Sequence, residues 1–143
     1  MGRKMLILYG SQTGSAQEVG ERIFRQASRR NFSPQISSMD AYDRANLINE
    51  EFVIFVASTT GDGDPPDNMR VFWKFLLRKG LPSDILSTIT FAVFGLGDSS
   101  YPKFNAVARK LRTRLKQLGS MEIFEPGWAD DQSANGLEGD FDN

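Results

Sequence analysis

Three short runs of apolar residues in this chain each lead directly into a segment rich in glycine and small polar residues. The runs are MLILY (5–9), FVIFVA (52–57) and FAVF (91–94), and the segments after them are GSQTGSA (10–16), STTGDGDPPDN (58–68) and GLGDSSYPKFN (95–105). Short and nearly continuous apolar runs are typical of parallel strands that are covered on both faces. Two weaker runs, at 36–39 and 121–124, each predict a further strand.

The stretches between these runs carry apolar residues at helical spacing. One predicted helix has Val19, Ile23 and Ala27 on a face, a second has Met69, Phe72, Trp73 and Leu76, and a third has Val107, Leu111, Leu115 and Leu118. Alternation of five strands with helices predicts an α/β fold, a doubly wound five-stranded parallel sheet in one domain over residues 1–143. With the strand order 2-1-3-4-5, the three glycine-rich segments meet beyond the carboxyl ends of the strands, where such sheets bind ligands.

The composition removes several classes of function. The chain has no Cys and no His, which excludes disulfides, thiolate chemistry, most zinc sites and imidazole-based triads. The formal net charge of −1 gives no bulk attraction to nucleic acid. No apolar run is long enough to cross a bilayer and no signal peptide is visible, so we expect a soluble, intracellular protein without a membrane partner.

The first glycine-rich segment has the groups that bind a phosphate monoester without a counter-ion. It offers the hydroxyls of Ser11, Thr13 and Ser15, the Gln12 amide, and the first N–H groups of a helix predicted to start near Ala16. It has no lysine and matches neither the nucleoside-triphosphate loop nor the G-x-G-x-x-G pattern. The alternative is a Ser/Thr-rich helix cap that binds nothing, and only the other two segments argue against it.

The second and third segments carry groups that suit a planar ring. Gly61 and Gly63 allow close backbone approach and a reorientable peptide, and Tyr101 and Phe104 follow a strand end where a polar turn is usual. Taken singly, the glycines indicate an ordinary turn and Tyr101 a cover for the edge of the core. A ring-stacking aromatic, a mobile peptide and a monoester pocket at one edge together predict a flavin mononucleotide (FMN) site.

All three segments resemble the FMN-binding domain of diflavin reductases, which has the flavodoxin fold. The stretch NLINEEFVIFVASTTGDGDPPDNM, followed by FWKFLLRKGLP, is most similar to the cytosolic NADPH-dependent diflavin oxidoreductases, and the resemblance runs from about Lys4 to the C-terminus. It implies that NADPH reduces FAD on a separate C-terminal domain and that FAD passes electrons to FMN. It further implies that FMN delivers them singly to an iron–sulfur protein of the anamorsin type, for cluster assembly in the cytoplasm.

The resemblance also implies which residues contact FMN. Residues 11–16 would hold the phosphate and ribityl end, 58–61 would line the ring near N5 and the pyrimidine edge, and 96–105 would wrap the outer side, with Tyr101 stacked on the ring. Asp131, in GWADDQ, matches the acidic position that closes the site. The expected contacts are Ser11, Gln12, Thr13, Gly14, Ser15, Ala16, Ser58, Thr59, Thr60, Gly61, Leu96, Gly97, Asp98, Ser99, Ser100, Tyr101, Pro102, Lys103, Phe104, Asn105 and Asp131.

Three features depart from the family pattern. Thr60 stands where several relatives have an aromatic residue on the inner ring face, with Trp128 as a candidate substitute. Asp98 stands where relatives often have Asn, which adds a negative charge beside the ring. The chain stops at LEGDFDN, where the family's last helix should continue, and no segment suits FAD or NADPH. We therefore expect the N-terminal part of a longer reductase, one that does not oxidise NADPH by itself.

The charge pattern predicts a surface for a partner, and the predicted topology is compatible with other functions. We interpret the basic residues at 109, 110, 112, 114 and 116 as a solvated helix face, and Asp62, Asp64, Asp67 and Asp98 as a docking surface for an electron-transfer partner. A phosphoacceptor receiver domain needs acidic residues after the first strand and an Asp after the third, where this chain has YGS (9–11) and AST (57–59). A stand-alone flavodoxin shuttle and a flavodoxin-like interaction module without cofactor remain as alternatives.

Overall fold

The computed structural model describes residues 3–11, 14–59, 64–97, 106–123 and 127–130. The strands are β1 (Arg3–Gly10), β2 (Phe32–Ser38), β3 (Phe52–Ser58), β4 (Thr90–Gly97), β5 (Met121–Glu122) and β6 (Gly127–Asp130). The helices are α1 (Ser15–Ser28), α2 (Arg70–Leu76) and α3 (Ala106–Gln117), with two 3₁₀ helices, η1 (Arg44–Asn49) and η2 (Asp67–Met69). No helix in these ranges is long and apolar enough to cross a membrane.

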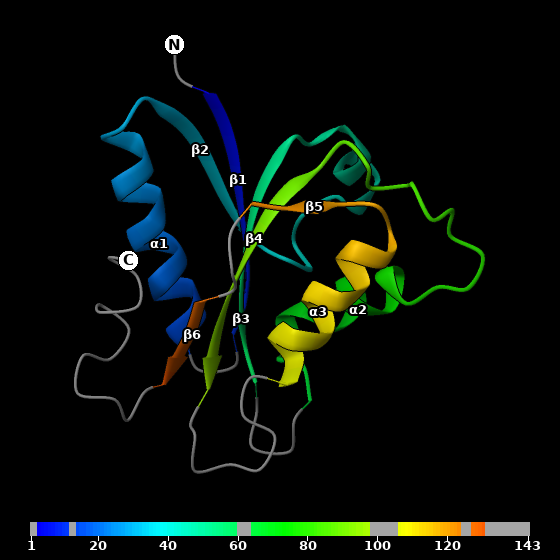
Figure 1. Ribbon diagram of the computed structural model, residues 1–143. Coiled ribbons are helices and arrows are strands. Elements are labelled where there is room, and N and C mark those ends of the chain that lie inside the picture. The colour runs from blue at the N-terminus through cyan, green and yellow to red at the C-terminus, as the bar shows by residue number, and fades with distance from the viewer. Residues whose placement is uncertain (1–2, 12–13, 60–63, 98–105, 124–126, 131–143) are drawn as a thin grey trace.

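The strands form one parallel sheet in the order β2-β1-β3-β4-β5, with β6 paired to β4 (Figure 1). This confirms the predicted fold class and strand order. The register places Gly10 of β1 beside Ala57 of β3, and Ala57 beside Gly95 of β4. The three glycine-rich segments therefore leave the sheet at the same level and the same edge.

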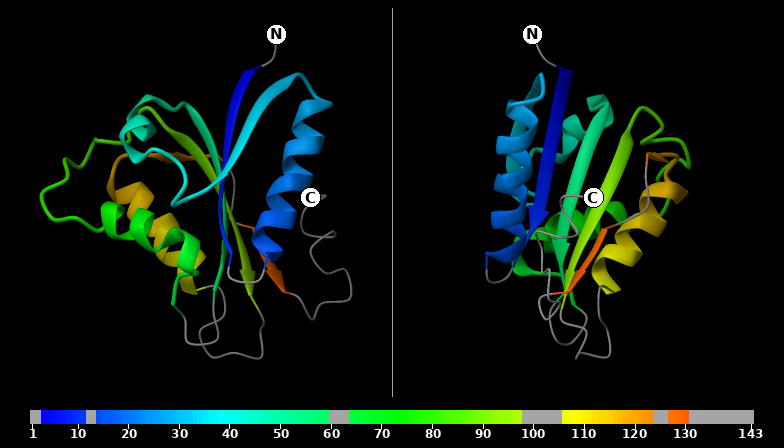
Figure 2. Two further views of the ribbon diagram at one scale, coloured as in Figure 1. Left: turned by 180° about the vertical axis from the view of Figure 1, so that it is seen from behind. Right: turned by 60° about the vertical axis from the view of Figure 1, so that its left-hand side comes forward.

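Helices cover the two faces of the sheet unequally. Figure 2 shows α1 on one face, and α2 and α3 together on the other. Side chains of β3 alternate between the two faces: Phe55 packs with the α2 and α3 side, whereas Ile54 and Val56 pack with the α1 side. This alternation explains why β3 is apolar throughout, because each of its residues from Val53 to Ala57 is buried.

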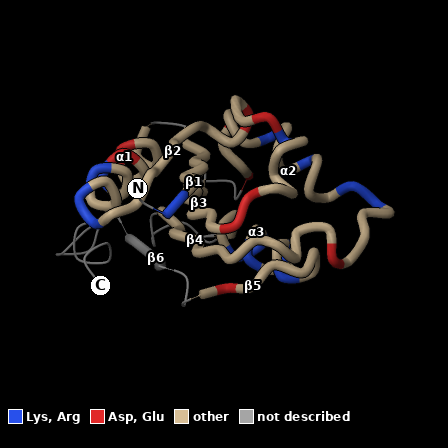
Figure 3. The backbone as a smooth tube through the Cα atoms, turned by 90° about the horizontal axis from the view of Figure 1, so that it is seen from above, with Lys and Arg blue, Asp and Glu red and all other residues tan. Residues whose placement is uncertain are grey.

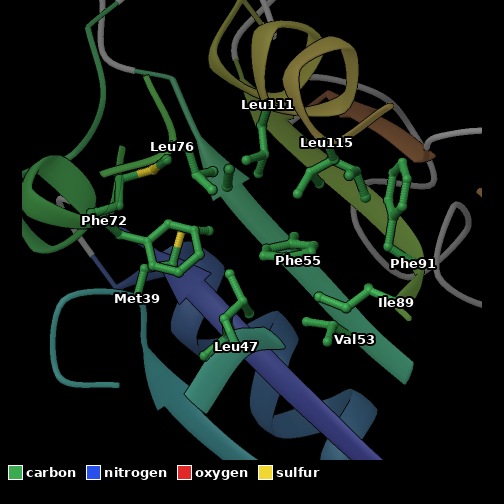
Figure 4. Close-up of a cluster of buried hydrophobic side chains, with 14 of the residues drawn as sticks. Met39, Leu47, Val53, Phe55, Phe72, Leu76, Ile89, Phe91, Leu111 and Leu115 are labelled. Atoms are coloured by element: carbon green, nitrogen blue, oxygen red, sulfur yellow. The ribbon is translucent and has the colours of Figure 1, made fainter. Parts of the chain in front are cut away.

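Phe55 lies at the centre of the core on the α2 and α3 face (Figure 4). Its ring centroid is 6.2 Å from that of Phe72 in α2 and 6.5 Å from that of Phe91 in β4, both within the range of favourable aromatic contacts. Leu111 and Leu115 of α3 pack in the same cluster. The predicted apolar faces of the second and third helices therefore do form this core.

The outer strands differ from the prediction. A strand was expected at 121–124, but β5 covers only Met121–Glu122, and β6 pairs with the later half of β4. The last residue of the predicted run, Phe124, lies outside the described residues. At the opposite edge of the sheet, β2 begins at Phe32, four residues before the weak apolar run at 36–39. The strand can include Pro34 because an edge strand has one side without a pairing partner.

Candidate functional site

The candidate site is the edge of the sheet at the carboxyl ends of β1, β3 and β4 (Figure 1). Of the residues predicted to contact FMN, the structure describes Ser11, Gly14, Ser15, Ala16, Ser58, Thr59, Leu96 and Gly97. It brings these together at the end of β1, the start of α1 and the ends of β3 and β4. Gln12, Thr13, Thr60, Gly61, residues 98–105 and Asp131 lie outside the described ranges, and their roles stay predictions.

Ser11 is a structural element of the first segment. Its side chain is buried, and its Oγ accepts hydrogen bonds from the N–H groups of Gly14 (2.8 Å) and Ala16 (3.2 Å). The two hydrogen bonds thus hold the start of α1 close to the end of β1. The hydroxyl proton of Ser11 is still available for donation to another acceptor. Gly14 caps the helix with φ of 96°, a left-handed conformation that glycine adopts without steric cost.

The start of α1 keeps donors that are not used within the described residues. Glu18 donates its N–H to the Gly14 carbonyl, which is the first helical bond. No described residue accepts from the N–H of Ser15 or Gln17, which belong to the same first turn. Unsatisfied N–H groups at a helix start, together with the helix dipole, attract an anion. The phosphate monoester that the sequence predicts at this helix start stays a prediction.

Asn68 joins the first and second segments. Its Oδ1 accepts from the N–H of Ser11 (2.7 Å), and its carbonyl accepts from the N–H of Asp40 (2.9 Å). Asp40 in turn accepts from the N–H groups of Val71 (3.3 Å) and Phe72 (2.8 Å), so its carboxylate caps α2. The sequence analysis missed both residues, because Asp40 caps a helix about thirty positions away and no local spacing reveals such a pairing.

Close packing behind β1 fixes the position of this loop. A Cβ on Gly10 would lie 2.4 Å from Sδ of Met69, whose side chain is fully buried. Glycine is therefore required at Gly10 for β1 to approach η2. The requirement is steric, since φ at this residue is not positive.

Thr59 links β3, β4 and α3. Its N–H donates to the carbonyl of Leu96 (3.0 Å), and its Oγ1 accepts from the N–H of Val107 (3.1 Å) in the first turn of α3. Leu96 and Ala16 are buried with the core on the α1 face. Leu96 can therefore face the candidate site only through its backbone, and the side chain of Ala16 packs into the core beneath the start of α1.

A separate cavity of about 650 Å³ lies at the other end of the sheet. Its lining includes Arg3, Tyr42, Glu50 and Phe52, from the beginnings of β1 and β3 and the chain around η1. Burial, and then the hydrogen bond and negative charge of Glu50, raise the pKa of Tyr42, which stays a neutral donor to that carboxylate. None of the residues predicted for FMN lines this cavity, so it plays no part in the candidate site.

Comparison with known proteins gives a matching family and individual relatives. Residues 7–143 match the family described as flavodoxin. NADPH-dependent diflavin oxidoreductase 1 of Danio rerio is 56% identical over 99% of this chain, and that of Arabidopsis thaliana is 50% identical over 98%. The chain spans only 24% and 23% of the length of these two relatives.

Solved structures share the fold over nearly the whole chain. A flavodoxin variant from Pseudomonas aeruginosa has a TM-score of 0.80 at 28% identity, covering 95% of this chain and 90% of its own. A flavodoxin from Streptococcus pneumoniae has a TM-score of 0.81 at 21% identity, covering 97% and 90%. With the family match over residues 7–143 and this sheet order, the chain belongs to the flavodoxin family.

Proposed function

We propose that this chain binds FMN at the carboxyl edge of its sheet and transfers electrons as the FMN domain of an NADPH-dependent diflavin oxidoreductase. One observation carries the proposal: three glycine-rich segments leave the sheet in one row, beside a helix start where the N–H groups of Ser15 and Gln17 have no acceptor among the described residues. The 56% identity to the diflavin oxidoreductase of Danio rerio supports the assignment to that group.

The donor set fits FMN better than a nucleoside polyphosphate. Residues 10–16 contain hydroxyl, amide and backbone donors and no lysine, which suits one terminal phosphate and gives no charge to neutralise a longer chain of phosphates. FMN, when bound, supplies one- and two-electron redox chemistry. The residues at the start of α1 bind the phosphate, and those after β3 and β4 hold the ring and exclude water from it.

The longer protein would carry the other cofactors of the electron-transfer chain. A C-terminal part of the same polypeptide would hold FAD and NADPH and would supply the electrons for FMN, and the acceptor would be an iron–sulfur protein of the anamorsin type in the cytoplasm. The acidic residues Asp62, Asp64, Asp67 and Asp98 supply the charge that guides this transient encounter. Asp64 and Asp67 are exposed, as such a role requires.

Titration of the apoprotein with FMN and with riboflavin tests the site. Riboflavin lacks the phosphate, so it should bind far more weakly than FMN. Thr13→Ala and Ser15→Ala should each weaken FMN about ten- to a hundredfold, because each removes a donor worth about 1.5–3 kcal/mol to a charged group. Ser33→Ala, an exposed serine at the opposite end of the sheet, should leave the affinity unchanged. Equal affinity for the two flavins would contradict the proposed phosphate site.

Tyr101→Ala tests the proposed stacking on the outer face of the ring. Loss of the stacking contact should cost on the order of 1 kcal/mol in FMN affinity. The second one-electron potential should also become less negative, because an electron-rich ring disfavours added negative charge. Titration and potentiometry on the same preparation measure both effects. Native values for both would assign the stacking role to Phe104 or Trp128.

A stand-alone flavodoxin shuttle is the second candidate, favoured by the 90% coverage of a bacterial flavodoxin. A domain of a diflavin reductase, loaded with FMN, should not be reduced by NADPH alone. Addition of the separately produced remainder of the Danio rerio relative should restore reduction. If NADPH still does not reduce the protein after that addition, although dithionite does, the stand-alone shuttle would be favoured.

A further inference from the structure

The surface between α2 and α3 has a hollow that the flavin site does not explain. The hollow has a volume of about 450 Å³, and its lining consists of Trp73 and Leu77 with Arg109, Lys110, Thr113, Arg114 and Gln117. A second hollow of about 320 Å³ lies on the other side of Trp73, lined by Asp64, Pro65, Arg70 and Lys74. Figure 3 shows α2 and α3 side by side, and Trp73 of α2 belongs to the lining of both hollows.

The floor of this hollow is apolar and accessible. Leu77 is 50% exposed, and Trp73 is partly exposed although it packs against the core on the α2 and α3 face. Both belong to one helical stripe, since they are four residues apart. A tryptophan held in place by the core is a rigid apolar contact, the type of side chain that dominates binding energy at protein interfaces.

The basic residues of α3 divide into two groups. Arg112 and Lys116 form ion pairs with Glu122 (2.7 and 3.2 Å), and Arg114 donates to the carbonyls of Leu76 (2.6 Å) and Arg78 (3.3 Å), which holds the end of α2. Arg109 and Lys110 are exposed and form no ion pair within the part of the chain that the structure describes. The interpretation of α3 as a uniformly solvated basic face therefore does not describe it.

We propose that the α2–α3 groove, lined by Trp73, Leu77, Arg109 and Lys110, docks an acidic amphipathic peptide segment of a partner protein. An apolar side chain of the segment sits against Trp73 and Leu77, and its carboxylates pair with Arg109 and Lys110. Charge complementarity favours an acidic partner, since every ionisable residue that lines this hollow is a cation. Helix–groove recognition of this type needs an apolar anchor at the centre and charges at the rim.

A nucleic-acid ligand fits these observations less well. The net charge of the chain is −1, and the neighbouring hollow contains the carboxylate of Asp64. Phosphate binding draws on a broad cationic surface, whereas here an apolar floor is the main feature. The inference does not depend on FMN, because none of the lining residues belongs to the predicted flavin contacts.

The test is a titration of the full chain with a peptide probe, in the presence and absence of FMN. The NMR signals of the backbone amides and the indole groups report binding. The probe is a synthetic peptide of about 16 residues with Phe and Leu four apart on one helical face and Glu at the flanking positions. A scrambled peptide of equal composition and a polyglutamate of equal length are the references. Expected are saturable shifts at Trp73, Leu77 and the α3 positions 109–117, with or without FMN.

Two variants separate the apolar and the charged contributions. Trp73→Ala should weaken the probe about tenfold or more, as expected for a central aromatic anchor. Arg109→Glu with Lys110→Glu should also weaken it, and should remove most of the affinity difference between about 50 and 300 mM salt. The matched control is Arg29→Glu with Arg30→Glu, an exposed pair at the end of α1 on the other face of the sheet.

Each other outcome would overturn the proposal. Equal weakening by the α1 control would show nonspecific attraction, and equal binding of polyglutamate or the scrambled peptide would show charge without an apolar anchor. Tighter binding of a single-stranded oligonucleotide at the same residues would assign the groove to nucleic acid. Absence of shifts at these residues at about 1 mM probe would remove the docking role. FMN affinity, measured on the same samples, tests the flavin site separately.

Discussion

The hydroxyl of Ser11 accepts two backbone N–H groups in a buried position, so the side chain acts as a template for the turn from β1 into α1. Ser11→Ala would leave the Gly14 and Ala16 donors without this acceptor. We expect the free energy of unfolding to fall by about 1–3 kcal/mol, the cost of unsatisfied buried groups. Urea unfolding measures it, with Ser33→Ala as an exposed control that should change stability by less than about 0.5 kcal/mol. A loss equal to that of the control would mean that water satisfies both donors.

Glu122 makes the stability of the chain depend on pH. Burial raises the pKa of its carboxyl, but hydrogen bonds and charge from Arg112 and Lys116 outweigh burial, and the pKa lies below the usual 4.5. A lowered folded-state pKa stabilises the fold above the unfolded pKa, and that stabilisation is lost as pH falls through the folded value. Glu122→Gln should therefore be less stable by about 1 kcal/mol at neutral pH, an amount typical of a partly exposed ion pair.

Urea unfolding across pH tests this linkage. The difference between the native chain and Glu122→Gln should shrink as pH falls below about 4.5. Glu51→Gln, at an exposed position at the start of β3, should parallel the native chain throughout. A gap for Glu122→Gln that stays constant with pH would show that packing, and not charge, accounts for the loss.

At the scale of elements, α2 depends on a cap from outside its own segment. Asp40 follows β2 and accepts from the N–H groups of Val71 and Phe72. Asp40→Ala should cost about 0.5–2 kcal/mol of stability, as for other helix caps, and Asp40→Asn should cost less because one oxygen acceptor remains. Chemical unfolding of the two variants gives the comparison. Equal losses for both would indicate that the carboxylate charge, and not the acceptor, stabilises α2.

The predictability of each element follows from its surroundings. The strands β1, β3 and β4 were evident in the sequence because burial on both faces makes them continuously apolar. The edge elements were weaker signals: β2 contains Pro34, and η1 crosses between strands as a 3₁₀ helix with only Leu47 buried. No periodicity marks such segments, since few of their side chains face the core.

The candidate site also has features that the sequence predicts and features that it does not. The position of the glycine-rich segments at one edge could be predicted, because strand order alone determines it. The bonds from Asn68 to Ser11 and from Asp40 to α2 could not, because they join residues 57 and 31–32 positions apart. Their partners are selected by tertiary packing, which leaves no spacing pattern in the chain.

For the whole molecule, FMN binding and folding should be linked. A ligand that binds only the folded state stabilises it by about 2.7 kcal/mol at a concentration one hundred times its Kd. FMN should therefore raise the Tm by several degrees for a chain of this size. Riboflavin at equal concentration should raise it less, and a thermal scan with each flavin gives the result. An equal rise with both would show that the phosphate adds nothing to affinity.

The division of the strand beside β4 has a consequence for how this fold can vary. From Phe91 to Phe94, β4 advances three residues, whereas its partner advances five, from Glu122 to Gly127. The strands β5 and β6 therefore pair with β4 in registers that differ by two residues. Each register is set by the strand's own pairing with β4. A change in the number of residues between Glu122 and Gly127 can therefore leave the pairing of β6 at the functional edge unchanged.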